Sequence, residues 1–146
     1  MIHLLFAGLL LGSTPVGAGL EHRVELPHAS GAVAAHYVGD VIVRHRQTGA
    51  VGAPGRPSTL RCQWEASLTV ERQARHASGS AAIRSLRRDA VAKGSRVGWC
   101  DASRGAIEQE VAARSDEWQR HMLALAEEDR AELLAEIDRL HGTRQG

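Results

Sequence analysis

Cys62 and Cys100 are the two residues of this 146-residue chain best suited to covalent chemistry. Reactive or metal-binding dithiols usually lie close together, as in Cys-x-x-Cys, whereas these two are 38 residues apart. Cys62 shares one face of an alternating segment with Trp64, and Trp99 directly precedes Cys100. The spacing therefore predicts a structural disulfide in the core, beside indole rings, and disfavours a redox or metal-binding pair.

Seven histidines follow the first eighteen residues, and their spacing does not indicate a metal site. None forms an i,i+4 pair, a His-x-His motif or a Cys–His spacing of the zinc type. His36 and His45 are nine residues apart, so they would project from opposite faces of one strand. We interpret the histidines as scattered surface residues and expect no metal and no cofactor. They are His22, His28, His36, His45, His76, His121 and His141.

The serines do not match a known nucleophile motif. Ser95 lies between Gly94 and Gly98, but it is displaced from the Gly-x-Ser-x-Gly position of a nucleophile elbow. Ser78 and Ser80 flank a glycine, which is typical of a turn. His-Glu-x-x-His, phosphate loops and Ser-x-x-Lys are absent. We therefore assign no catalytic residue and favour a protein that is not an enzyme, with a small periplasmic hydrolase or metal-handling protein as the alternative.

A cluster of basic residues is the best candidate contact surface. A basic surface attracts anionic partners, here an envelope protein or an anionic component of the cell surface. Nucleic acid is not expected, because the cluster lacks aromatic residues on which bases stack. The competing interpretation is that these side chains face acidic residues of a C-terminal helix, namely Glu127, Glu128, Asp129, Glu132 and Glu136. The cluster consists of Arg84, Arg87, Arg88, Lys93 and Arg96.

Charge is divided unevenly along the chain, although the net charge is only +1. Residues 19–100 contain 12 basic and 6 acidic residues, and residues 101–146 contain 6 basic and 11 acidic residues. Opposite charges on two parts of a small protein indicate most simply that the parts dock on each other.

The first eighteen residues are typical of a secretory leader. An apolar run from Leu4 to Leu11 is followed by Gly, Ser, Thr and Pro, and then by Val16-Gly17-Ala18, a small-residue cleavage site. A buried first strand or helix is the alternative. Residues 1–18 are thus expected to be a signal peptide, residues 19–146 a single exported domain, and the location periplasmic or secreted. Contact with a membrane would be peripheral at most.

Strict alternation predicts two long strands. Residues 60–72 place apolar side chains on one face and polar side chains on the other, and residues 33–46 repeat the pattern. The Gly- and Pro-rich segment 49–58 between them predicts an antiparallel hairpin with a long tip. A shorter strand at residues 23–26 ends at Pro27. Residues 80–93 fit either a helix or a strand, and we favour the strand because Cys100 must return to Cys62.

From Ser103 to Leu140 the apolar period changes to 3.6 residues, which predicts a helix. A straight helix of this length would measure roughly 57 Å, well beyond a compact domain of this size. The helix either projects or breaks, and Asp129 with Glu132 resembles a helix start. We weigh a continuous helix and a kink at Asp129 equally.

Together these patterns predict an α+β fold. Its small antiparallel sheet of three or four strands, within about residues 22–100, would be covered by a long helix or kinked helix pair at about residues 103–141. One disulfide would join the two parts. The function most consistent with the sequence is a small exported envelope protein that serves as a binding or assembly module.

Overall fold

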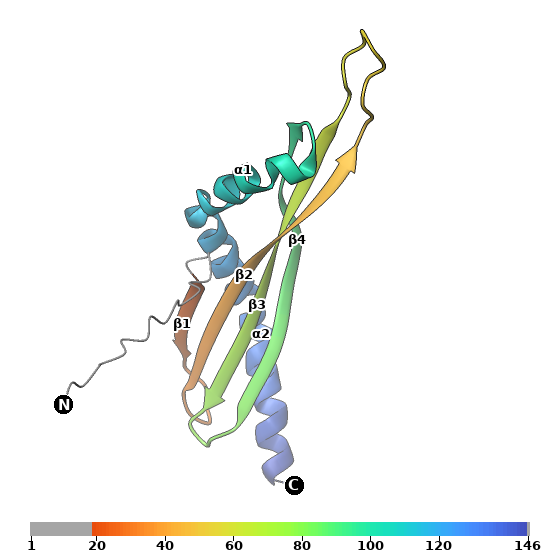
Figure 1. Cartoon of the computed structure of the whole chain (residues 1–146). Coiled ribbons are helices and arrows are strands. Elements are labelled where there is room, and N and C mark those ends of the chain that lie inside the picture. Colours follow the sequence, from red (N-terminus) through yellow and green to blue (C-terminus); the bar gives the residue numbers. More distant parts are fainter. Residues whose placement is uncertain (1–18, 146) are drawn as a thin grey trace, which may run out of the picture.

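The computed structural model describes residues 19–145 and has the expected α+β architecture. Four antiparallel strands form a sheet in the order β1-β2-β3-β4, so that each strand pairs with its neighbours in sequence. Two helices follow and pack against one face of the sheet (Figure 1). The strands are β1 (Leu20–Leu26), β2 (Val33–Thr48), β3 (Arg61–His76) and β4 (Ala81–Val97). The proposed leader, residues 1–18, lies outside the described residues.

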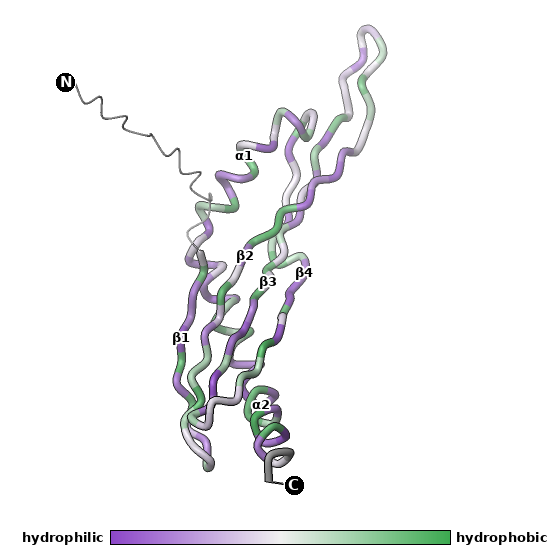
Figure 2. Tube along the Cα trace, turned by 60° about the horizontal axis from the view of Figure 1, so that its bottom comes forward, coloured by the Kyte–Doolittle hydropathy of each residue, from purple (hydrophilic) through white to green (hydrophobic). Residues whose placement is uncertain are grey.

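Alternation places the two faces of the sheet in different surroundings. Along β3 the even-numbered residues from Cys62 to His76 are all buried, while most odd-numbered residues are half-buried or exposed. Figure 2 shows hydrophobic and hydrophilic residues alternating along the strands. One face is therefore covered by the helices and the other, which we call the open face, is exposed to solvent.

Of the ambiguous segment 80–93, residues 81–93 lie in strand β4, as favoured from the return to Cys100. Strand β4 contains a bulge, because Leu68 pairs with Arg88 whereas Ala66 pairs with Ala92. At the bulge the backbone N–H of Ala90 donates to Ser67 Oγ at 3.3 Å, and Ala90 has a φ of 48°. Two extra residues in β4 leave the alternation in phase, so odd-numbered residues stay on the open face on both sides of the bulge.

The helical region breaks, but not at Asp129. Two residues, 113 and 114, separate helix α1 (Cys100–Ala112) from helix α2 (Ser115–Gln145). Helix α2 continues through Asp129. At the break the indole N–H of Trp118 donates to the carbonyl oxygen of Val111 at 2.7 Å. The same carbonyl oxygen also accepts the backbone N–H of Arg114 at 3.1 Å, so it takes part in two bonds at the end of α1. The interpretation of Asp129 as a helix start is wrong, because its carboxylate bonds to side chains from the sheet.

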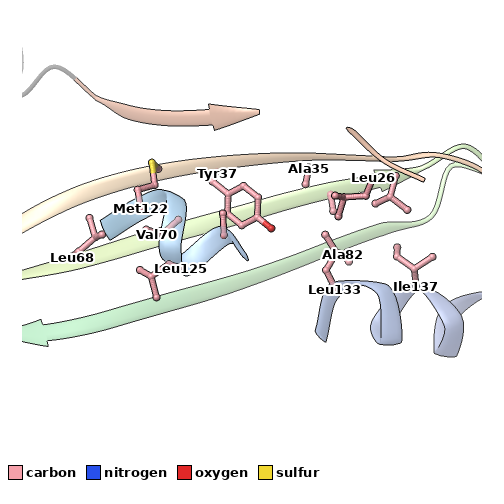
Figure 3. Packing of buried hydrophobic residues seen from close by; sticks show 13 residues of the cluster. Leu26, Ala35, Tyr37, Leu68, Val70, Ala82, Met122, Leu125, Leu133 and Ile137 are labelled. Atoms are coloured by element: carbon pink, nitrogen blue, oxygen red, sulfur yellow. The ribbon is translucent and has the colours of Figure 1, made fainter. Parts of the chain in front are cut away.

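Two hydrophobic clusters hold the helices to the sheet. The larger one joins α2 to the end of the sheet near the β1–β2 and β3–β4 turns, and ten of its residues are labelled in Figure 3. The smaller one joins α1 and the start of α2 to the other end of the sheet, with Trp64 and Trp118 as its largest members. Gly94 permits the packing of Trp64, because a Cβ at residue 94 would lie 2.5 Å from the indole ring.

The predicted disulfide between Cys62 and Cys100 is confirmed. It joins the start of β3 to the first residue of α1, with a Cα–Cα distance of 4.8 Å, and Cys62 is fully buried in the smaller cluster. Beyond this point the β2–β3 hairpin extends past α1 (Figures 1 and 2). Its tip, residues 49–60, contains the Gly- and Pro-rich segment expected from the sequence.

Candidate functional site

The sheet divides the basic cluster of β4 between its two faces. Three of the five residues face the helices and form ion pairs there. The partners of Arg84 and Arg88 are among the acidic residues named from the sequence, so the docking of these two on the C-terminal helix is confirmed, whereas Arg96 pairs with Glu110 of α1 instead. The pairs are Arg84 with Asp129 at 3.6 Å, Arg88 with Glu128, and Arg96 with Glu110 at 3.3 Å. These three arginines are therefore engaged within the fold.

Arg87 and Lys93 lie on the open face instead, because both are odd-numbered residues of β4. Arg87 forms an ion pair with Asp89 two residues away. The hydrogen bond from Arg87 lowers the pKa of the Asp89 carboxyl below its ordinary value, and the charges of Arg87 and Arg44 act in the same direction. Of the five predicted contact residues, Lys93 alone has no ion-pair partner within 4 Å among residues 19–145.

Lys93 lines a hollow on the open face that has a volume of about 860 Å³. Small-molecule sites usually have volumes of about 300–1,000 Å³, so the hollow is large enough for a ligand. A second cavity, between β1 and α2, has only about 200 Å³. Lining the larger hollow are Arg44, His45, Arg46, Gln63, Trp64, Glu65, Lys93, Gly94 and Ser95.

Strand register explains how these residues meet. Arg44 pairs across β2 and β3 with Glu65, and Glu65 pairs across β3 and β4 with Lys93. The two cations therefore flank one carboxylate, on strands that lie about 10 Å apart. Arg46, Gln63 and Ser95 form the next row of residues. Because side chains alternate, His45, Trp64 and Gly94 contribute mainly backbone to the floor of the hollow.

The hollow carries net positive charge. Arg44, Arg46 and Lys93 line it together with a single carboxylate, Glu65, and among residues 19–145 none of these four forms an ion pair within 4 Å. Arg61 adds a further cation at the rim, where its Nε donates to Ser95 Oγ at 3.1 Å. We call this group of residues the basic hollow. Its side chains can bind an anion without breaking existing ion pairs.

Sequence reasoning missed two of the basic hollow's cations, Arg44 and Arg46. Both fall on the polar face of the strand predicted at residues 33–46, but the basic cluster predicted from the sequence contains residues of β4 alone. Their alternate spacing on one face was the available signal. The register of β3 with its two neighbours places Arg44 and Arg46 of β2 on the same face as Lys93 of β4.

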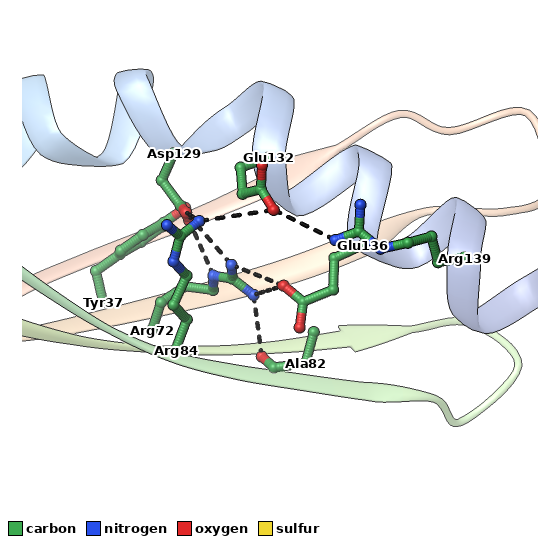
Figure 4. A network of polar contacts seen from close by, with 8 residues as sticks. All are labelled: Tyr37, Arg72, Ala82, Arg84, Asp129, Glu132, Glu136 and Arg139. Atoms are coloured by element: carbon green, nitrogen blue, oxygen red, sulfur yellow. Dashed lines mark hydrogen bonds and ion pairs between the residues drawn. The ribbon is translucent and has the colours of Figure 1, made fainter.

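A second polar cluster, centred on Arg72, is buried between the sheet and α2 (Figure 4). Arg72 is fully buried, donates from Nε to Asp129 Oδ2 at 2.9 Å, and donates to Glu136 Oε2 at 3.1 Å. The Tyr37 hydroxyl also donates to Asp129 Oδ2, at 3.0 Å. Arg72 further donates to the carbonyl oxygen of Ala82. Every charged group here has a partner, so we assign this cluster to stability rather than to ligand binding.

The buried cluster alters how its members bind protons. Burial lowers the pKa of the Arg72 guanidinium, but its bonds to Asp129 and Glu136 outweigh burial and raise it above its ordinary value. Burial and the Asp129 carboxylate raise the pKa of Tyr37 well above its ordinary value of 10.0. The contacts of the folded protein thus favour a charged Arg72 and a neutral Tyr37.

The raised pKa of Tyr37 predicts a loss of stability in alkali. In the unfolded chain Tyr37 ionises near its ordinary pKa of 10.0, whereas in the folded protein it stays neutral. The stabilisation is therefore complete below pH 10 and declines above it, by about 1.4 kcal/mol per pH unit. Tyr37 is the only tyrosine, so tyrosinate absorbance reports on it directly. We expect that absorbance to rise only as the protein unfolds, and Tyr37→Phe to remove this component of the pH dependence. A rise near pH 10 with tryptophan fluorescence still native would contradict the prediction.

The histidines are less scattered than the sequence suggested. His28, His76 and His141 come together at the end of the sheet that lies near the C-terminal part of α2, with ring centroids 6.0 and 5.8 Å apart in successive pairs. The sequence separates them widely, and only the meander brings the two turns and α2 to one place. Within residues 19–145 no three His, Cys, Asp or Glu side chains are placed to share one metal ion.

Two further observations are negative. None of the helices in residues 19–145 is both long enough and apolar enough to cross a membrane. Searches of protein-family models, of curated protein sequences and of solved structures found no match to this chain.

Proposed function

We propose that the protein is an exported binding module, not an enzyme, and that the basic hollow holds a polyanionic component of the cell envelope. The observation that carries this proposal is the set of three unpaired cations, Arg44, Arg46 and Lys93, around a hollow of about 860 Å³. Export is supported by the leader-like pattern of residues 1–18 and by the disulfide, which is typical of oxidising compartments.

The shape of the site favours an extended anion over a single small one. Arg44 and Lys93 lie on strands about 10 Å apart, with Glu65 between them. A single phosphate cannot reach both cations without crowding this carboxylate. A chain of phosphates or carboxylates can contact the two sides in turn and leave Glu65 between its charges. Guanidinium groups suit such partners, because they bond phosphate and carboxylate oxygens in pairs.

The experiment is a binding titration with two probes that share this chemistry. One probe is soluble inorganic polyphosphate, and the other is phosphatidylcholine vesicles with and without phosphatidylglycerol. We expect the double variant Arg44→Glu/Lys93→Glu to bind at least about tenfold more weakly, because each cation near an anionic surface contributes about 1 kcal/mol. Added salt should weaken binding of the unaltered protein, because these charges are exposed.

A matched control is available on the same face of the sheet. Arg23→Glu/Arg75→Glu changes the net charge equally, and both residues lie on the open face far along the strands from the basic hollow. This control should bind like the unaltered protein. Equal losses in the two double variants, or binding of neither probe by the unaltered protein, would overturn the proposal. Binding of vesicles but not polyphosphate would identify lipid headgroups as the source of the anion.

A further inference from the structure

Two turns of identical sequence lie side by side at the end of the sheet opposite the basic hollow. His-Ala-Ser-Gly occurs at residues 28–31, between β1 and β2, and again at residues 76–79, between β3 and β4. In a four-stranded meander these two connections share one end of the sheet. They are joined directly, because the backbone N–H of Ala77 donates to the carbonyl oxygen of Ala32 at 3.1 Å.

Backbone bonds fix the tautomer of the histidine in each turn. The backbone N–H of Ser30 donates to His28 Nδ1 at 3.2 Å, and that of Ser78 donates to His76 Nδ1 at 3.1 Å. A ring nitrogen that accepts a hydrogen bond carries no proton. In the neutral rings the proton is therefore on Nε2 in both histidines.

These tautomers give the side-chain bonds one direction. His76 Nε2–H donates to Ser30 Oγ at 3.0 Å, and the Ser30 hydroxyl donates to His28 Nδ1 at 2.6 Å. His28 Nε2–H in turn donates to Asp138 Oδ1 of α2 at 2.6 Å. Ser30 thus has a base within hydrogen-bond distance, and that base is oriented by a carboxylate. This is the arrangement by which serine nucleophiles are activated.

We propose that Ser30 Oγ is a nucleophile that accepts the acyl group of an activated carboxylic ester. The Ser30 hydroxyl gives its proton to His28 Nδ1 as Oγ forms a bond to the carbonyl carbon. The bond from that carbon to the leaving oxygen then breaks, and the leaving alcohol takes the proton from His28. The products are acylated Ser30 and a free alcohol. Asp138 is a positioning residue, because it acts through His28.

The second turn lacks the feature that activates the first. Ser78 Oγ lies 2.7 Å from His76 Nδ1, as Ser30 does from His28, but His76 Nε2 donates to Ser30 and not to a carboxylate. Ser78 also contacts Ser80 Oγ at 3.3 Å. Ser78 is therefore a control within the same molecule, with the same local sequence and the same kind of turn.

The geometry predicts one acylation per chain and not turnover. The backbone N–H of Ser30 is bonded to His28 Nδ1, and that of Gly31 is bonded to the carbonyl oxygen of His28. Neither amide is available to stabilise an oxyanion, which is a large part of catalysis by serine hydrolases. The acyl group should consequently remain on Ser30. Access is open, since Ser30 is half-buried and the Asp138 side chain is 67% exposed.

The test uses p-nitrophenyl acetate and peptide mapping of the full-length protein. Trypsin places the two serines in different peptides, Val24–Arg44 and His76–Arg84. We expect acetylation of Ser30 to be about a hundredfold faster than that of Ser78. Both serines have a histidine base, but only His28 is oriented by a carboxylate, which contributes about 10²-fold or more in serine triads. The titratable groups around His28 are Asp138 on α2 and His76 on β3, with His141 against His76.

Two variants separate activation from folding. Asp138→Asn should slow acetylation of Ser30 and alter its pH profile while leaving near-ultraviolet circular dichroism unchanged, because the Asp138 side chain is exposed. Ser78→Ala should leave the rate at Ser30 unchanged. Acetylation of Ser30 and Ser78 at equal rates would overturn the proposal, as would an unchanged rate at Ser30 in urea-unfolded protein. Since the basic hollow lies at the other end of the sheet, neither outcome affects the proposed binding function.

Discussion

Replacing Asp129 with alanine should lower the free energy of unfolding by about 3–5 kcal/mol, because the change leaves the Arg72 guanidinium buried without its main partner. Arg72 is fully buried, and Asp129 accepts bonds from it at 2.9 and 3.3 Å. The Tyr37 hydroxyl loses its acceptor in the same variant. Glu136 remains near Arg72, but it is 27% exposed and replaces only part of the lost interaction. Urea denaturation followed by tryptophan fluorescence measures the change.

Glu128 provides the matched control. It precedes Asp129 on α2, carries the same charge and also pairs with an arginine of β4, but its side chain is 63% exposed. Glu128→Ala should cost less than about 1 kcal/mol, because exposed ion pairs contribute little. Combining Asp129→Leu with Arg72→Met should recover much of the lost stability, since it removes both buried charges. Equal losses from Asp129→Ala and Glu128→Ala would show that burial does not determine the energy of this cluster.

Elements that depend on local pattern could be predicted from the sequence. Residues 60–72 alternate without interruption, and one face of the resulting strand is buried as the pattern requires. The 3.6-residue period after residue 103 likewise identified the helical region, although α1 begins at Cys100. The disulfide followed from the same alternation, because it placed Cys62 on the buried face.

The break between the helices could not be predicted, because its cause is not local. Residues 113 and 114 are Ala and Arg, and neither stops a helix. At the break the Trp118 indole donates to the Val111 carbonyl, and both residues pack in the smaller cluster. At Asp129 the local signal was present, yet its carboxylate is bonded to Arg72 and Tyr37 of the sheet. Tertiary contacts decided both positions.

The candidate sites were only partly accessible from the sequence, for a related reason. Lys93 was identified, but the cations opposite it depend on the register between three strands. Arg72 is an even-numbered residue of β3, so the alternation of the strand places it on the buried face although its side chain is charged. The repeated His-Ala-Ser-Gly was visible as a repeat. The contact between its two copies depends on the topology of the sheet. So does the bond from His28 of the first copy to Asp138 of α2.

Loss of the disulfide should lower the free energy of unfolding by about 4 kcal/mol, which is the chain-entropy expectation for a closed segment of 38 residues. Without the bond the unfolded chain gains freedom, while Cys62 remains packed among the residues of the smaller cluster. Urea unfolding of the protein with and without a reductant measures the difference.

The double variant Cys62→Ala/Cys100→Ala separates the bond from other effects of the reductant. Its unfolding midpoint should lie close to that of the reduced protein and should not change when reductant is added, because no other cysteine is present. Loss of the disulfide should lower local stability most at the end of the sheet where α1 packs, since the bond joins α1 to β3 there. Hydrogen exchange should therefore accelerate in α1 before it does in the part of α2 that carries Leu133 and Ile137. An unfolding midpoint that is the same with and without reductant would show that noncovalent packing alone holds α1 in place.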